Sequence, residues 1–320
     1  MGFISGGQPL YTIIISGENE SNADKGYSYV EVITGDFGKL QLPNLLTIGG
    51  HCLAMHNRAL VSCGGQAGKD YRNSFGIGCL QLDPKSRSWR FHSVLNEDEE
   101  YLRTAVSTKG GIYLLGFYHT VEHLSENAKK WRQVDFDPDK GDVREALNHS
   151  SAVVDQSDGE MIWIFGPENV FLLDLDKRSI SKLASKLNVP RFNQRCAYLP
   201  GTKKIIITGG HKPTPDVDED EEALDYTEIF DTEDRTITMA SPMNHKRDAH
   251  GIGTITVQGE DRVAVFGGTS RNNGSWISLD NLELCNPQTD VWDLSKIKLK
   301  ENYQEVTCVS VKLGEILSKI

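Results

Sequence analysis

A glycine-rich run is the first pattern in this chain that could carry chemistry. Gly64-Gly-Gln-Ala-Gly-Lys69 has the composition of a phosphate-binding loop, but its spacing is one residue short. Asp70 stands where Ser or Thr would bind magnesium, and no helix is expected to follow. His119 and His123 would lie roughly 13 Å apart on a strand, too far to chelate one metal. With no Gly-x-Ser-x-Gly motif either, we expect no catalytic residues and no cofactor.

Two aspartate runs have the alternating carboxylates of calcium loops. The first is Asp135-x-Asp137-x-Asp139 and the second is Asp216-x-Asp218-x-Asp220. In the first run the glycine comes one position late, at Gly141, and in the second there is no glycine and no clear final Glu. Asp135, Asp137 and Asp139 therefore remain weak calcium candidates, and no other metal site is expected.

The six cysteines form no CxxC pair, which argues against a zinc ribbon or a thioredoxin-like motif. A two-residue turn at Asn57 and Arg58 would pair positions whose numbers sum to 115, so Cys52 and Cys63 should face each other. They could form a disulfide in a secreted protein, but reduced thiols are the expectation.

The charge balance limits the classes of partner. A net charge of −11 makes nucleic acid and anionic membranes poor partners, because both attract cationic surfaces. A basic protein partner fits better. No apolar run approaches the roughly 20 residues that span a bilayer, and the first residues lack the features of a signal peptide. A cytoplasmic location is favoured, and secretion stays open.

Six short apolar runs, most of them closed by glycine, recur at intervals of 44 to 58 residues. Each run is typical of a buried strand. After each run, a polar residue that can cap a turn precedes a large apolar residue by six positions. These pairs are Thr34/Leu40, Asp83/Trp89, Ser125/Trp131, Asp174/Ile180, Asp231/Ile237 and Asn286/Trp292.

Another strand precedes every run except the first, while an unpartnered strand, 306–312, lies near the C-terminus. We therefore predict an all-β, six-bladed β-propeller of four-stranded antiparallel blades, closed by the C-terminal strand. Residues 1–320 would form one domain with blades at about 11–46 plus 303–313, 50–94, 102–136, 148–185, 193–242 and 247–299.

The repeat resembles the kelch family over essentially the whole chain. The matching features are Gly64-Gly65, Gly209-Gly210 and Gly267-Gly268, the tryptophans at 89, 131 and 292, and the segment from Met243 to His250. Gly116 and Gly166 depart from the pattern as single glycines. The resemblance implies a propeller that binds proteins, as kelch substrate receptors and scaffold proteins do. Kelch-like propellers also include sugar-modifying enzymes, which keeps that alternative open.

In a propeller the loops between second and third strands share one face with the loops between blades. Acidic residues concentrate on the loops expected at this face, notably 213–225 and 97–100. The candidate partner-binding residues there are Tyr71, Arg72, Tyr118, Asp216, Asp218, Asp220, Glu221, Arg271 and Trp276. Five more residues should surround the channel mouth at the starts of inner strands: Arg103, His149, Arg195, Arg247 and His250.

The function favoured by the sequence is a protein-interaction module that presents this acidic face to a protein partner. Exposed aromatic and arginine side chains are the usual anchors of such interfaces. The alternative is a glycan-binding or sugar-modifying propeller that uses the channel mouth, which would need a concave pocket.

Overall fold

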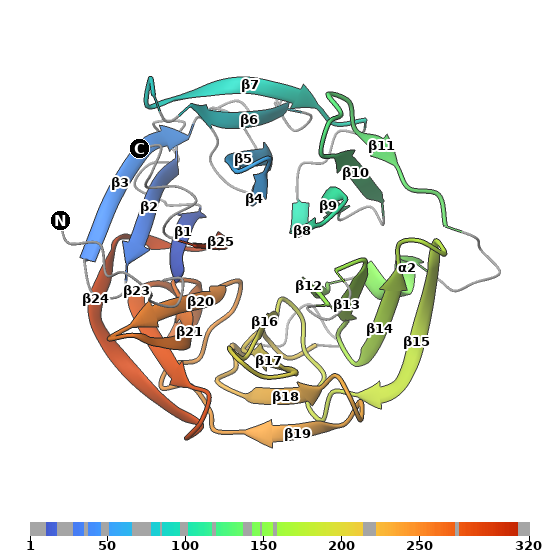
Figure 1. Ribbon diagram of the computed structural model, residues 1–320. Coiled ribbons are helices and arrows are strands. Elements are labelled where there is room, and N and C mark those ends of the chain that lie inside the picture. The colour runs from blue at the N-terminus through green and yellow to red at the C-terminus, as the bar shows by residue number, and fades with distance from the viewer. Residues whose placement is uncertain are drawn as a thin grey trace.

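The protein is an all-β propeller whose antiparallel sheets surround a central axis (Figure 1). The computed structural model describes residues 11–17, 28–34, 38–45, 51–65, 78–83, 85–96, 102–116, 120–136, 143–147, 149–155, 159–213, 222–272 and 275–312. Within these ranges the strands form six sheets, numbered here from 1 to 6 around the ring. The one helix described, α2 (Val143–Leu147), lies between sheets 3 and 4 in the chain. No helix in the described ranges is long and apolar enough to cross a membrane.

Sheets 1 to 3 each have four strands. Sheet 1 contains β25 (Val306–Lys312), β1 (Tyr11–Gly17), β2 (Ser28–Thr34) and β3 (Gly38–Leu45). Sheet 2 contains β4 (His51–His56), β5 (Ala59–Gly64), β6 (Gly78–Asp83) and β7 (Ser88–Val94). Sheet 3 contains β8 (Leu102–Thr108), β9 (Gly111–Gly116), β10 (Val121–Ser125) and β11 (Arg132–Gln133).

Sheets 4 and 5 repeat this plan, and sheet 6 extends it. Sheet 4 contains β12 (Ser151–Val154), β13 (Met161–Phe165), β14 (Asn169–Asp174) and β15 (Ser179–Lys186). Sheet 5 contains β16 (Arg195–Tyr198), β17 (Lys204–Thr208), β18 (Thr227–Asp231) and β19 (Ile237–Ala240). Sheet 6 contains β20 (Gly251–Val257), β21 (Glu260–Phe266), β22 (Thr269–Asn272), β23 (Ser275–Asn286) and β24 (Val291–Tyr303).

The prediction of four strands per blade therefore holds for five sheets and is wrong for sheet 6. Strand β23 is long enough for its first part to pair with β22 and its second part to pair with β21 and β24. The extra strand, β22, forms a hairpin with the first part of β23, in a region where the sequence analysis placed Arg271 and Trp276 on a loop.

The C-terminal strand closes the ring, as predicted. β25 pairs with β1 in antiparallel register from Tyr11↔Lys312 to Gly17↔Val306, and it becomes the innermost strand of sheet 1. The inner strands β25, β4, β8, β12, β16 and β20 then follow one another around the axis (Figure 1).

The polar residues predicted to cap the turns before the outer strands do so in several sheets. The Asp83 carboxylate accepts hydrogen bonds from the backbone N–H groups of Lys85 and Ser86, at 2.9 and 3.3 Å. Backbone N–H groups two or three residues later also donate to Asp174, Asp231 and Asn286. Each bond satisfies a turn donor locally, which lets the chain reverse tightly.

The paired glycines occupy positions where a side chain would collide with the backbone. Gly210 and Gly268 have φ angles of 92° and 81°. A Cβ atom at Gly210 would lie 2.3 Å from the carbonyl oxygen of Phe192, and one at Gly268 would lie 2.5 Å from that of Asp248. The left-handed backbone and the close approach of the segment that leads into the inner strand of the same sheet both favour glycine.

The described residues form six apolar core clusters, and each cluster lies between two neighbouring sheets. Between sheets 6 and 1, for example, Phe266 and Tyr303 pack against Ile33 and Val306, and all four are buried. Since the sheets alternate with these clusters around the ring, every sheet buries both of its faces.

The cysteine register is predicted correctly, but the disulfide is not. Cys52 lies opposite Cys63 across the turn at Asn57 and Arg58, which both have positive φ. Cys63, however, is bonded to Cys79 of the next strand, while Cys52 keeps its thiol. The expectation of reduced thiols is therefore wrong for Cys63 and Cys79, because β6 places Cys79 opposite Cys63 on its other side.

Removing β25 should strongly destabilise the fold. A chain that ends at Glu305 loses Val306 and Val311, which are buried in the clusters on either side of sheet 1. Burial of two valines contributes about 3–6 kcal/mol, so the free energy of unfolding in urea should fall by at least that amount. A chain that ends at Lys312 is the matched control. Equal unfolding midpoints for the two chains would contradict the closing role of β25.

Candidate functional site

The hairpin formed by β22 and β23 presents an exposed aromatic side chain beside a cation. Arg271 and Trp276 lie opposite each other in the register of this hairpin. The guanidinium carbon of Arg271 is 5.9 Å from the centre of the Trp276 ring, within the range of a cation–π contact. Trp276 and Ile277 are 41% and 42% exposed. The hairpin therefore combines apolar area with a positive charge that is already oriented.

A buried arginine fixes the base of this hairpin. Arg247 is completely buried and donates hydrogen bonds to the carbonyl oxygen of Gly267 and to the carboxylate of Glu283, both at 2.9 Å. It also donates to the Asn281 side chain. The backbones of Asp248 and Thr269 exchange two hydrogen bonds of 2.8 and 2.9 Å beside it. The hairpin thus emerges from a rigid part of the sheet.

The charges of this buried pair compensate each other. Burial by itself would raise the pKa of Glu283, but the Arg247 guanidinium and the N–H donors of Asn244 hold this pKa below its usual value. Burial lowers the pKa of Arg247, and the Glu283 carboxylate opposes that shift. We infer that both groups are charged at neutral pH, so removing either partner would leave an uncompensated charge inside the protein.

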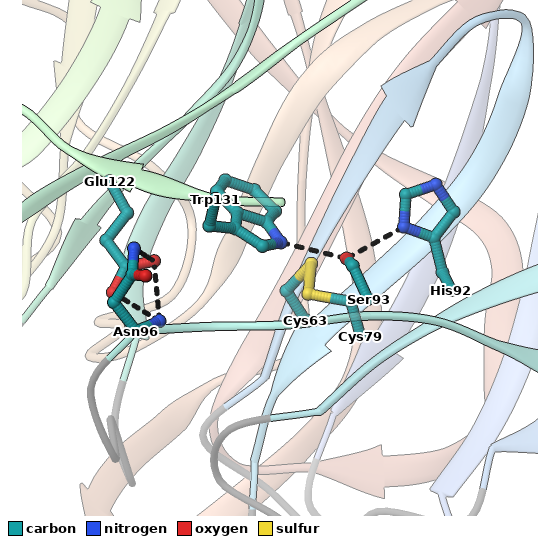
Figure 2. Close-up of a disulfide and its surroundings, with 7 residues drawn as sticks. All are labelled: Cys63, Cys79, His92, Ser93, Asn96, Glu122 and Trp131. Carbon is teal, nitrogen blue, oxygen red and sulfur yellow. Dashed lines mark hydrogen bonds between the residues drawn. A yellow bond between two sulfur atoms is a disulfide. The ribbon is translucent and has the colours of Figure 1, made fainter. Parts of the chain in front are cut away.

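In the part of the chain that the structure describes, buried glutamates join neighbouring sheets at four places, which the sequence analysis missed. Each accepts a hydrogen bond from a backbone N–H of the preceding sheet, at 2.6 to 3.0 Å. Figure 2 shows one example, in which Asn96 donates to Glu122 through its backbone and side chain. The signal was present in the sequence, because each glutamate comes three residues before a turn-capping residue. The glutamates are Glu31, Glu122, Glu228 and Glu283.

A central cavity of about 490 Å³ is lined by residues of all six inner strands or the segments that lead into them. Arg195 is on its wall, and the hydrogen bonds that it donates within the described ranges are long, at 3.4 and 3.3 Å to the carbonyl oxygens of Asn193 and Gln194. Among the described residues no carboxylate forms an ion pair with Arg195. His149, also on the wall, stacks on Phe192 with ring centres 4.5 Å apart. His51 lines the cavity too, and burial lowers its pKa to about 4, so its ring is neutral near pH 7.

Two of the five residues predicted at the channel mouth line the cavity, namely His149 and Arg195. Arg103 lies in β8, where only its backbone is described. The prediction that Arg247 and His250 lie at the channel mouth is wrong, because both side chains are completely buried and neither lines the cavity. His250 shares a 2.8 Å hydrogen bond with Thr208 and is held neutral by burial, which puts its pKa well below the usual value. The side chain of His250 points toward the preceding sheet and that of Arg247 toward its own sheet, instead of the channel, which the sequence analysis did not consider.

Most of the predicted acidic site lies outside the described residues. This holds for Tyr71, Arg72, Tyr118, Asp216, Asp218, Asp220 and Glu221, and also for the calcium candidates Asp137 and Asp139. Asp135 is described and exposed, and the described residues contain no group of three metal-binding side chains. Glu222, at the end of the acidic loop, forms ion pairs with Lys212 and Lys246, and hydrogen bonds from these lysines lower its pKa to about 2.

Comparison with known proteins gave no match, either to a family model or to a curated protein.

Replacing Glu283 with Ala should destabilise the protein by about 3–5 kcal/mol, because the charge of Arg247 would remain buried without its partner. Urea unfolding followed by circular dichroism measures this change. Glu260→Ala is the matched control, since Glu260 is largely exposed and pairs with Arg262 at the surface, so its effect should stay within about 0.5 kcal/mol. Similar losses for the two variants would show that the buried pair does not anchor the hairpin.

Proposed function

We propose that this chain is a six-bladed kelch-type propeller, formed as one domain by residues 1–320, that binds another protein and is not an enzyme. The β-propeller fold is compatible with such a role. The observation that carries the proposal is the exposed Trp276 and Ile277 on the β22–β23 hairpin, next to Arg271.

The hairpin has the properties of an interface anchor. Tryptophan and arginine are enriched among the residues that contribute most to binding, and here they are preassembled across two paired strands. The hydrogen bonds of Arg247 hold the hairpin base in one geometry. A partner therefore loses little binding free energy in ordering this surface.

The net charge indicates the chemistry of the partner. At −11 the protein attracts basic surfaces over long range, and the acidic loop 213–225 adds to this field. Glu222 contributes little to this field, because Lys212 and Lys246 already neutralise its charge. We expect a basic protein partner whose approach is guided by the loop and whose tight contacts form on the hairpin.

The central cavity supports a second function, the binding of a small polar ligand such as a glycan. Its volume of about 490 Å³ lies within the usual range for ligand pockets. Arg195 and His149 would supply polar contacts. His250, the third polar contact expected for this alternative, is completely buried, so we place it second.

Trp276→Ala should weaken partner binding by about thirtyfold, as expected for loss of an interface anchor worth about 2 kcal/mol. The immobilised protein is used to capture partners from a cell extract, and the dissociation rate of each purified partner is then measured. Met239→Ala on β19 is the matched control, because Met239 is also an exposed apolar residue but lies on a different sheet. Partners that bind both variants within threefold of the native protein would place the site elsewhere.

Reversing the charges of Asp216, Asp218, Asp220 and Glu221 should slow association and leave dissociation nearly unchanged. Exposed charges act mainly through the encounter rate and are screened beyond about 8 Å at physiological salt. Association of the native protein should therefore slow as salt rises, and the variant should lose most of that dependence. An unchanged association rate would exclude the acidic loop from partner binding.

A further inference from the structure

Three cysteines lie side by side across sheet 2, on three consecutive strands. Cys52 of β4 is directly opposite Cys63 of β5, and Cys63 is directly opposite Cys79 of β6. Cys63 and Cys79 form a disulfide, while Cys52 is a thiol. All three are buried in the apolar cluster between sheets 2 and 3.

The register places the three side chains in one row. Residues directly opposite each other on adjacent antiparallel strands point to the same face of the sheet, and neighbouring strands are about 4.8 Å apart. Cys63 is therefore the central cysteine, with a possible partner on each side. Thiol–disulfide exchange needs the attacking sulfur to approach along the S–S axis, and a row of cysteines perpendicular to the strands provides this approach.

A serine hydroxyl continues the row beyond Cys79. Ser93 of β7 is opposite Cys79, and its Oγ accepts a 2.9 Å hydrogen bond from the Trp131 indole and lies 2.8 Å from His92 Nδ1 (Figure 2). A thiolate released at Cys79 would lie beside this hydroxyl, which can donate a hydrogen bond to it. At the other end, Cys52 belongs to the wall of the central cavity.

We propose that sheet 2 contains a thiol–disulfide exchange site in which Cys52 and Cys79 are alternative partners of Cys63. The Cys52 thiolate attacks the sulfur of Cys63, the Cys52–Cys63 bond forms, and the Cys63–Cys79 bond breaks. Cys79 leaves as a thiolate and takes up the proton that Cys52 released, so no external oxidant or reductant is needed. The covalent link thereby moves from β5–β6 to β4–β5, next to the cavity.

Serine variants test which pairs can form. After air oxidation of the folded protein, thiols are blocked and disulfides are mapped by mass spectrometry without reduction. Cys79→Ser should contain a Cys52–Cys63 disulfide, and Cys52→Ser should retain Cys63–Cys79. Cys63→Ser should contain neither, because Cys52 and Cys79 lie two strands apart, at about 9–10 Å, beyond the reach of a disulfide. A folded Cys79→Ser variant with Cys52 and Cys63 both alkylated would overturn the proposal.

The native protein tests the exchange itself and does not depend on the folding of any variant. It is incubated without thiol reagents between pH 7 and 9, quenched with acid and mapped. The Cys52–Cys63 peptide should appear up to tenfold faster per pH unit, as more Cys52 becomes thiolate, and should be absent from Cys52→Ser. A disulfide that remains solely Cys63–Cys79 at every pH would overturn the proposal.

The remaining cysteines serve as an internal control for unfolding. Cys196, Cys285 and Cys308 lie opposite Ile207, Val263 and Ile15, so none of the three has a cysteine as its register partner and none should form a disulfide while the fold is intact. New disulfides confined to Cys52, Cys63 and Cys79 would support a local exchange. Disulfides that include any of the other three would show scrambling through the unfolded chain and would contradict it.

Discussion

Each sheet of this protein has two apolar faces, and burying both of them is the constraint that the rest of the architecture satisfies. Sheet 2 shows the pattern, since Leu53 and Leu60 pack toward sheet 1 while Val61 and Cys63 pack toward sheet 3. An open row of such sheets would leave an apolar face in water at each end, whereas a ring leaves none. The return of β25 to β1 is therefore a consequence of how the sheets are patterned.

Apolar packing alone is not directional, and the buried glutamates add direction to it. Each carboxylate accepts hydrogen bonds from the neighbouring sheet, which fixes one relative position of the two sheets. Sheets 2 and 4 have Leu80 and Phe171 at the equivalent position, so their interfaces with the preceding sheets lack this carboxylate. Between sheets 3 and 4 the helix α2 contributes Ala146 and Leu147 to the core instead.

The sequence allows prediction of features that local chemistry determines. The glycine pairs, the turn caps and the Cys52–Cys63 register all follow from backbone geometry within a few residues. The Cys63–Cys79 bond could not be predicted, because residues 65–77 separate the two strands and the length of this segment does not set a register. The burial of Arg247 depends on its ion pair with Glu283, which lies 36 residues later, so patterns of neighbouring residues could not predict it. The hairpin residues Arg271 and Trp276 were identified, but their direct contact required the structure.

The closure of the ring also determines how the molecule responds to mechanical force. Tyr11 and Lys312 are paired at one end of the β1–β25 ladder, and the hydrogen bonds of an antiparallel ladder run perpendicular to the strands. Tension applied to these two residues therefore acts first on the hydrogen bonds at that end. The bonds of the ladder then break one after another and are not sheared all together. Val306, Thr307 and Cys308 of the detaching strand belong to the cavity wall. A pull on Tyr11 and Lys312 would thus open the propeller at this seam and expose its central cavity at low force.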